Sequence, residues 1–192
     1  MSAQEEHRWL PEAEYLAAEA AAPYKSEYVA GEIFAMAGAS ERHNRITLNI
    51  AFHLRAATRG QPCRAFMADM KLWVSTRSAY YYPDAMLVCD PEDDHPQYKT
   101  SPCLLAEVLS TATAAIDERE KWLAYRDIPS LRYYLLVDSE KVHARLLSRD
   151  GEIWREQILD PEDVVSLHCG GLSITLSLDN FYVTVQTMPL LP

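Results

Sequence analysis

Hydrophobic residues recur along the chain with two different periods, which separate predicted helices from predicted strands. Between Ser40 and Gly60 the apolar residues return every three or four positions, which predicts an amphipathic helix that Ser40 caps and Gly60 ends. Residues 11–22 are rich in Ala and Glu and open with Pro11, which favours a short helix. The apolar residues of the 40–60 helix, among them Ile46, Ile50 and Leu54, are expected to share one face.

Strand-like segments fill most of the remaining chain. Single strands are predicted at 64–74, 80–90, 103–110, 131–138 and 172–185, the last ending in a short helix or turn, and hairpins at 26–38 and 142–159. Residues 103–110, CLLAEVLS, are apolar on both faces, as in a central strand. A helix is expected to begin at Ser110, Thr111 or Thr113 and to run to about Asp127. This order predicts a mixed α/β (α+β) layer fold, with an N-terminal helix and hairpin and an added antiparallel hairpin.

Length and charge narrow the class of protein. A chain of 192 residues suits a single domain over 1–192 with one core. No segment approaches the roughly 18 apolar residues of a membrane-spanning helix. The first residues also lack the pattern of a signal peptide, so a cytoplasmic protein is expected. The formal net charge of −10 argues against binding nucleic acid by bulk charge, although it allows a local basic cleft or a carboxylate site for a divalent metal.

The cysteines give no sign of a metal site. Cys63, Cys89, Cys103 and Cys169 include no C-x-x-C pair, so zinc is not expected. In a reducing cytosol all four are expected to be free thiols, with Cys89 and Cys103 as core residues within strands.

Two carboxylates interrupt apolar strand faces. Counting in twos places Asp84 on an apolar face of the 80–90 strand and Glu107 on an apolar face of 103–110. Pro83 favours a position for Asp84 at a strand edge or bulge. An unpaired buried carboxylate costs several kcal/mol or takes up a proton. If the strands are neighbours, the two carboxylates can converge and bind Mg²⁺ or Mn²⁺, and such a metal can activate water and stabilise charge on a phosphodiester.

Further polar residues are candidates to complete such a site. Lys121 lies on the side of the following helix that borders its apolar stripe, from which its ammonium can reach the carboxylates. His43, Glu27, Glu32 and Asp69 are candidates to add a metal ligand or to orient a water.

Each residue also has an ordinary structural interpretation. Asp84 can cap a turn or pair with an arginine, and Glu107 can form a structural salt bridge with Lys121. Lys121 can instead lie on a solvated helix face, and His43 can be a core histidine.

Several segments together resemble one known family. They are KSEYVAGEIFAMAGASERHNRI (25–46), YYYPDAMLVCD (80–90), CLLAEVLSTAT (103–113) and IDEREKWLAYRDIPSLRYYLLVD (116–138). They look like the Uma-two family of restriction-endonuclease-like proteins, and the resemblance covers about residues 12–183. That family is placed in the PD-(D/E)XK nuclease superfamily.

The resemblance implies a role for each candidate residue. Pro83-Asp84 corresponds to the PD element and Glu107 to the (D/E) element. The superfamily's usual lysine stands two residues after the acid, where this chain has Leu109. In similar members the lysine has moved to the following helix, so the resemblance implies that Lys121 takes its place.

The leading functional hypothesis is therefore a metal-dependent endonuclease acting on DNA. Asp84 and Glu107 would hold Mg²⁺ or Mn²⁺, and Lys121 would act on the attacking water and the transition state. One alternative is a nuclease-fold binding or structural protein without catalysis. Another is a hydrolase of a different phosphate ester, for which the sequence offers no Gly-rich phosphate loop. Superfamily nucleases often act as dimers, so a homodimer is an expectation as well.

Overall fold

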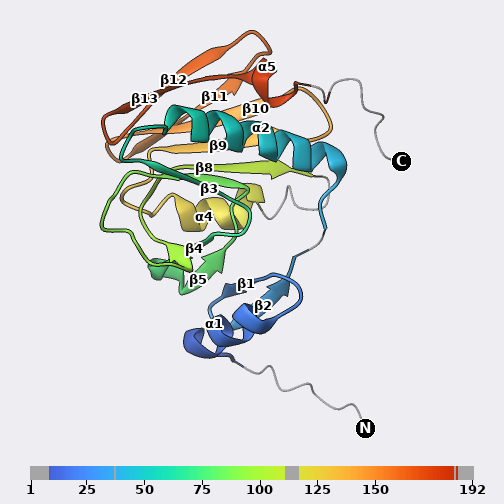
Figure 1. Cartoon of the computed structure of the whole chain (residues 1–192), viewed down its shortest axis with the longest axis vertical. Helices are drawn as coiled ribbons and strands as arrows, with labels where there is room; N and C mark the ends of the chain where they lie inside the picture. The colour runs from blue at the N-terminus through green and yellow to red at the C-terminus, as the bar shows by residue number, and fades with distance from the viewer. Residues whose placement is uncertain (1–8, 37, 111–116, 184, 186–192) are drawn as a thin grey trace.

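The computed structural model describes residues 9–36, 38–110, 117–183 and 185. Figure 1 shows a small N-terminal unit beside a larger body. The unit contains helix α1 (Glu12–Ala21) and the hairpin of β1 (Ser26–Val29) and β2 (Glu32–Ala35), as predicted. Ala30 and Gly31 form its two-residue turn, and both have positive φ, 48° and 98°, which matches the twist of the flanking strands.

The N-terminal hairpin belongs to the smaller of two main sheets. This sheet has the order β2-β1-β5-β4-β7, and its other strands are β4 (Lys71–Val74), β5 (Ala79–Tyr81) and β7 (Tyr98–Lys99). A 3-10 helix, η1 (Ser75–Arg77), connects β4 to β5. The N-terminal unit is therefore joined to the body by strand pairing between β1 and β5.

The larger sheet is mixed and has the order β11-β10-β9-β8-β6-β3. Its strands are β3 (Arg64–Met67), β6 (Ala85–Val88), β8 (Pro102–Leu109), β9 (Tyr133–Asp138), β10 (Ala144–Asp150) and β11 (Ile153–Leu159). Neighbouring strands are antiparallel except β8 and β9, which are parallel. A separate hairpin, β12 (Val164–Cys169) with β13 (Leu172–Ser177), completes the strands.

Strand β8 lies within the larger sheet and is buried along its whole length, as its apolar sequence predicts. Helix α2 (Glu41–Ala57) covers one face, where Ile46 and Ile50 pack in the same core as Leu104. Ser40 caps this helix by accepting the His43 N–H. The other face of β8 packs toward the π-helical turn η2 (Asp117–Lys121) and helix α4 (Trp122–Tyr125).

Two predicted strands were wrong as single elements. The 64–74 segment divides into β3 and β4, and the 80–90 segment divides into β5 and β6. In each case the two halves belong to different sheets. In 80–90 both halves are buried, and in 64–74 the partly buried β3 is followed by the largely buried β4, so periodicity alone does not reveal that the chain changes sheet.

The predictions for the C-terminal half were largely confirmed. The hairpin around Asp150-Gly151 is confirmed as β10 and β11, and the predicted tail is confirmed as β13 followed by helix α5 (Leu178–Phe181). Strand β12 was not predicted. Two of the three residues proposed to begin the helix after 103–110, Thr111 and Thr113, lie outside the described residues. Within the described ranges, no helix has both the length and the apolar character that crossing a bilayer requires.

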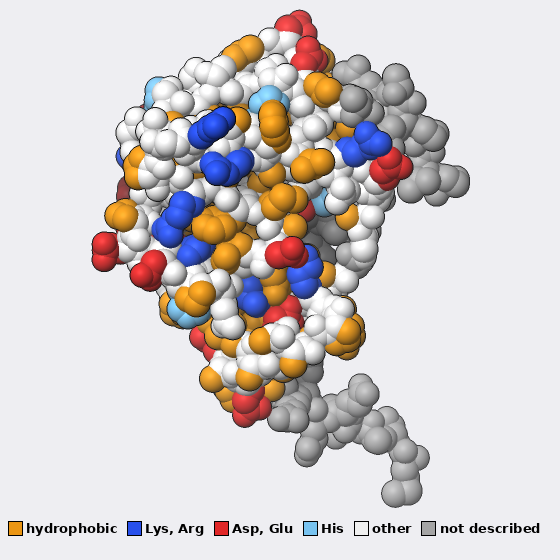
Figure 2. All heavy atoms as spheres, in the orientation of Figure 1, with side chains coloured by type: hydrophobic (Ala, Val, Ile, Leu, Met, Phe, Trp, Pro, Cys, Tyr) orange, Lys and Arg blue, Asp and Glu red, His pale blue; other side chains and the backbone are white. Residues whose placement is uncertain are grey.

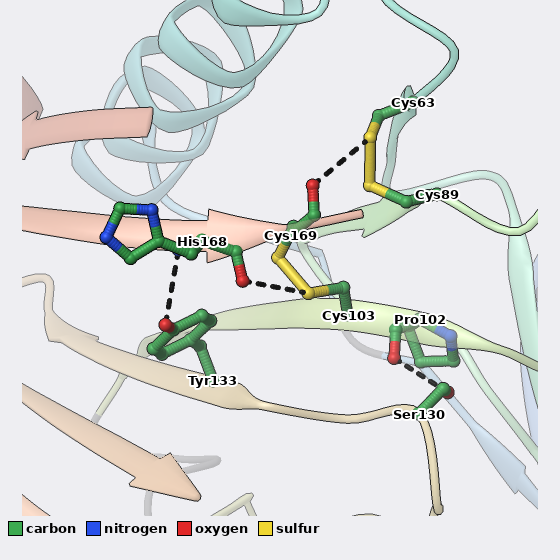
Figure 3. Close-up of a disulfide and its surroundings, with 8 residues drawn as sticks. All are labelled: Cys63, Cys89, Pro102, Cys103, Ser130, Tyr133, His168 and Cys169. Atoms are coloured by element: carbon green, nitrogen blue, oxygen red, sulfur yellow. Dashed lines mark hydrogen bonds between the residues drawn. A yellow bond between two sulfur atoms is a disulfide. The ribbon is translucent and has the colours of Figure 1, made fainter. Parts of the chain in front are cut away.

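The expectation of four free thiols was wrong. Cys63 is bonded to Cys89, and Cys103 is bonded to Cys169. Figure 3 shows the two disulfides next to each other, with Cys63 Sγ 3.6 Å from the Cys169 carbonyl oxygen. The bonded residues are 26 and 66 positions apart in sequence, so only the packing of the strands brings them together.

The turn between β12 and β13 is shaped to fit these disulfides. Gly170 has φ of +54°, and a Cβ at this position would lie 2.5 Å from the Cβ of Cys89. Glycine is therefore required here, both for the backbone conformation and for the close approach. The Cys103–Cys169 disulfide in turn joins the β12–β13 hairpin to the start of β8.

We predict that replacing Cys103 and Cys169 together by serine lowers the free energy of unfolding by about 4 kcal/mol, because the loop that this disulfide closes is long. Urea denaturation of the oxidised protein measures the change. The Cys63→Ser, Cys89→Ser pair should cost less, since its loop is shorter. Equal stability of the wild type with and without a reducing agent would contradict both expectations.

Candidate active site

The site is built where the chain crosses from the smaller sheet to the larger one. Strand β5 ends at Tyr81, and β6 begins at Ala85. The antiparallel pairing of β6 with β8 ends at Ala85 and Ala106, so Asp84 and Glu107 are the residues next to the last pair on each chain segment. The Asp84 carboxylate also accepts the N–H of Val108, the residue after Glu107, at 2.7 Å. The structure thus makes neighbours of the two strands that carry the predicted carboxylates.

Glu107 is almost completely buried, with 2 % of its surface exposed, and cationic and hydroxyl groups lie beside it. Lys121 Nζ is 3.5 Å from its Oε1, and the Tyr125 hydroxyl donates to the same oxygen at 3.0 Å. Lys121 is itself buried and lies 3.0 Å from Glu27 Oε1. One ammonium therefore lies between two carboxylates, one from β8 and one from β1.

The same network fixes neighbouring groups. Glu27 Oε1 also accepts the backbone N–H of Tyr82 at 3.1 Å, which ties the crossover segment to the N-terminal hairpin. Burial and the nearby Glu107 carboxylate raise the pKa of the Tyr125 hydroxyl well above its ordinary value. Tyr125 therefore remains a proton donor to Glu107 at any ordinary pH.

Asp84 is oriented from the other side by helix α2. His43 Nε2 lies 3.3 Å from Asp84 Oδ2, the oxygen that also accepts the Val108 N–H. Within the part of the chain that the structure describes, Oδ1 of Asp84 forms no hydrogen bond or ion pair. One carboxylate oxygen of Asp84 is thus held in place while the other is available for a ligand.

The remaining candidates lie elsewhere. Asp69 is 88 % exposed in its side chain and pairs with Lys25 at 2.7 Å. Glu32 lines a separate depression of about 650 Å³ with Trp9 and Phe34. The structure therefore groups Glu27, Glu107 and Lys121, and it groups His43 with Asp84, but it brings neither Asp69 nor Glu32 into these groups.

Tyr125 is the site residue that sequence reasoning missed. Its spacing of four residues from Lys121 places both side chains on one side of a helix, and that spacing was visible in the sequence. A tyrosine at that spacing is most often a core aromatic. Only the position of Glu107 beneath the helix shows that the Tyr125 hydroxyl donates a hydrogen bond to a carboxylate.

The carboxylates of the site are ligands of the kind that a hard divalent cation takes. Carboxylate oxygens are the ligands that Mg²⁺ and Mn²⁺ prefer, and Mg²⁺ usually keeps several waters beside one or two carboxylates. Asp84 and Glu107 supply such a pair. No group of three His, Cys, Asp or Glu side chains converges on one point among the described residues. Lys121 lies against both Glu27 and Glu107, whereas only one oxygen of Asp84 is held by neighbouring groups that the structure describes, so Asp84 is the carboxylate most open to a metal and Glu107 is the acid nearest to it on the adjacent strand.

Comparison with known proteins identifies the family. Residues 12–179 match the model of the Uma2 family, which is described as "Putative restriction endonuclease". The chain belongs to the Uma2 family. The match confirms the resemblance of its strand and helix segments to Uma-two proteins, and it covers both sheets and the candidate site.

Two relatives of this Uma2 chain come from Synechocystis sp. One, "Uncharacterized protein sll1609", is 42 % identical over 132 residues, which cover 67 % of this chain and 75 % of the relative. The other, "Uncharacterized protein slr1290", is 34 % identical over 168 residues, which cover 86 % and 88 %.

A solved structure confirms the fold. The crystal structure of a "putative nuclease belonging to DUF820" from Anabaena variabilis superimposes with a TM-score of 0.69. The alignment covers 89 % of this chain and 96 % of that one, at 14 % identity. The mixed sheet flanked by helices is therefore shared with a nuclease-like fold, as the sequence predicts.

The lysine beside Glu107 comes from the following helix and not from the position two residues after the acid. Leu109 stands two residues after Glu107 and packs in the core beneath α4, with Leu105 and Ala124. Lys121 instead brings its ammonium to Glu107 from the helix side. A lysine is thus next to the acid although the residue two positions later is apolar.

We predict that Tyr125→Phe lowers the free energy of unfolding by about 1–3 kcal/mol, because it removes a hydrogen bond to a buried, charged acceptor. Urea denaturation measures the change. Tyr24→Phe is the matched control, since Tyr24 is 67 % exposed. Equal stability of the two variants would show that the Tyr125 hydroxyl does not stabilise Glu107.

Proposed function

We propose that this Uma2 protein is a metal-dependent endonuclease that hydrolyses phosphodiester bonds in DNA. The observation that carries the proposal is that Asp84 and Glu107 adjoin the last pair of β6 and β8, where Asp84 accepts the Val108 N–H and the Lys121 ammonium lies beside Glu107. Family membership supports nuclease chemistry, and the carboxylate pair supports a divalent metal.

Asp84 and Glu107 would hold Mg²⁺ or Mn²⁺, which supplies a polarised phosphoryl oxygen and an activated water when bound. Oδ1 of Asp84 is the available oxygen for this purpose, because Oδ2 is held by Val108 and His43. His43 and Tyr125 are positioning residues, since each contacts a carboxylate and thereby limits its movement.

Lys121 would act on the water and on the charge that develops at phosphorus. Its ammonium is restrained by two carboxylates that come from different sheets, so it is preorganised to donate to an anionic phosphoryl oxygen or to position the attacking water. Glu27 contributes by holding this ammonium from the N-terminal unit.

We expect the purified protein to cleave plasmid DNA with Mg²⁺ or Mn²⁺ and to stop when the metal is chelated. Asp84→Asn and Glu107→Gln should each lower the cleavage rate by about 100-fold or more, because a metal supplies several kcal/mol of transition-state stabilisation. Gel analysis of nicked and linear plasmid measures the rate.

Glu92→Gln is the matched control, because it changes an exposed carboxylate in the loop after β6. It should cleave like the wild type. Melting temperatures of all variants identify any that fail to fold. Cleavage that survives both Asp84→Asn and Glu107→Gln would overturn the site, and DNA binding by the wild type without cleavage under any metal would favour a binding protein with a nuclease fold.

A further inference from the structure

Lys71 is a buried cation that the proposed chemistry does not use. It begins β4 and has 8 % of its surface exposed. Its ammonium lies 5.3 Å from the centre of the Tyr82 ring, and it forms no hydrogen bond or ion pair with any residue in the described ranges. Burying most of a lysine whose ammonium has no direct ion pair or hydrogen bond is costly.

Lys71 is not fully enclosed. It keeps 8 % of its surface exposed, and lysine side chains typically bury their stems while the ammonium stays at the water boundary. An anion can approach it there.

A second lysine shares the same ring. Lys25 Nζ lies 5.5 Å from the centre of the Tyr82 ring, donates to the Ala68 carbonyl at 3.1 Å and pairs with Asp69 at 2.7 Å. The Lys25 and Asp69 side chains are 41 % and 88 % exposed. An exposed pair of this kind contributes little to stability, so an incoming anion can displace Asp69 readily.

The nearby acid Glu19 does not neutralise Lys71 by direct pairing. Its two oxygens accept hydrogen bonds from the Ser26 N–H, the Ser26 hydroxyl and the Tyr82 hydroxyl. Burial lowers the pKa of the Lys71 ammonium, and the charge of Glu19 opposes that shift. Glu19 is thus held by other donors. Its charge favours the charged form of Lys71, but it forms no ion pair with the Lys71 ammonium.

Both lysines lie next to the candidate active site. The Tyr82 ring faces the lysines while its backbone N–H donates to Glu27, and Asp84 follows two residues later. The Ala68 N–H donates to the Asp84 carbonyl, so the turn that contacts Lys25 also contacts the site. Figure 2 shows Lys and Arg side chains along the face that it draws, from the region of α2 toward the N-terminal unit, with hydrophobic side chains between them.

We propose that Lys71 and Lys25, placed over the ring of Tyr82, form a phosphate-binding subsite that holds a backbone phosphate of the nucleic acid beside the one that is cleaved. The inference rests on the proposed function, because it assigns the anion to a nucleic-acid strand. Lysine binds phosphate as a point charge. A local pair of lysines therefore explains how a chain of net charge −10 can bind a polyanion.

Binding of a fluorescent DNA duplex of roughly 20 base pairs, in EDTA and at several salt concentrations, tests the subsite without the metal. Lys71→Met should weaken binding about 5- to 10-fold and reduce the salt dependence by about one phosphate contact, uniformly across sequences. Lys71→Arg keeps the charge and should retain the salt dependence. Asp69→Asn frees Lys25 and should tighten binding.

Lys141→Met is the matched control, because Lys141 is 69 % exposed and pairs with Asp138 on another part of the body. It should bind like the wild type. Equal affinity and salt dependence of Lys71→Met and the wild type would overturn the subsite, provided that melting temperatures show both to be folded. A wild type that is stabilised by inorganic phosphate but does not bind the duplex would overturn its assignment to nucleic acid.

The outcomes separate this inference from the proposed function. If Lys71→Met weakens duplex binding while no metal supports cleavage, the subsite stands and the nuclease proposal fails. If cleavage depends on Asp84 but duplex binding does not depend on Lys71, the nuclease proposal stands and the subsite fails. A wild type that neither binds nor cleaves contradicts both.

Discussion

The buried charge of Glu107 is the constraint on which the rest of the site depends. A carboxylate in a fully buried central strand is tolerated only with a cation and a hydrogen-bond donor beside it, and Lys121 and Tyr125 supply these. Lys121 in turn lies against Glu27, which belongs to the other sheet. The Glu107 carboxylate thus contacts the following helix through Lys121 and Tyr125. Through Lys121 it is also linked to Glu27 of the N-terminal hairpin.

This constraint was readable in the sequence because its cause is local. A carboxylate within CLLAEVLS conflicts with its apolar neighbours, and that conflict by itself predicts a nearby cation. The helix from Ser40 and the hairpin around Asp150-Gly151 were predictable for a similar reason, since a cap or a turn residue agrees there with the hydrophobic period. Asp84 and Glu107 adjoin the same pair of residues, Ala85 and Ala106, because the two strands are neighbours.

Other features depend on contacts between distant segments, and the sequence does not encode them locally. The disulfides join residues that meet only after the strands have packed, so the expectation of free thiols, which came from the expected reducing cytosol, was wrong. The changes of sheet within 64–74 and 80–90 leave no mark in the hydrophobic pattern. Asp69 resembled a site residue by its place near the strands, yet the turn that carries it points it to solvent and to Lys25.

A double-mutant cycle on Glu107 and Lys121 measures how far each buried charge depends on the other. The free energy of unfolding is measured for the wild type, Glu107→Gln, Lys121→Met and the double variant. If each charge is tolerated because of the other, the two changes are strongly non-additive, with a coupling of at least about 1.5 kcal/mol. A coupling below about 0.5 kcal/mol, within the range of independent sites, would contradict the account.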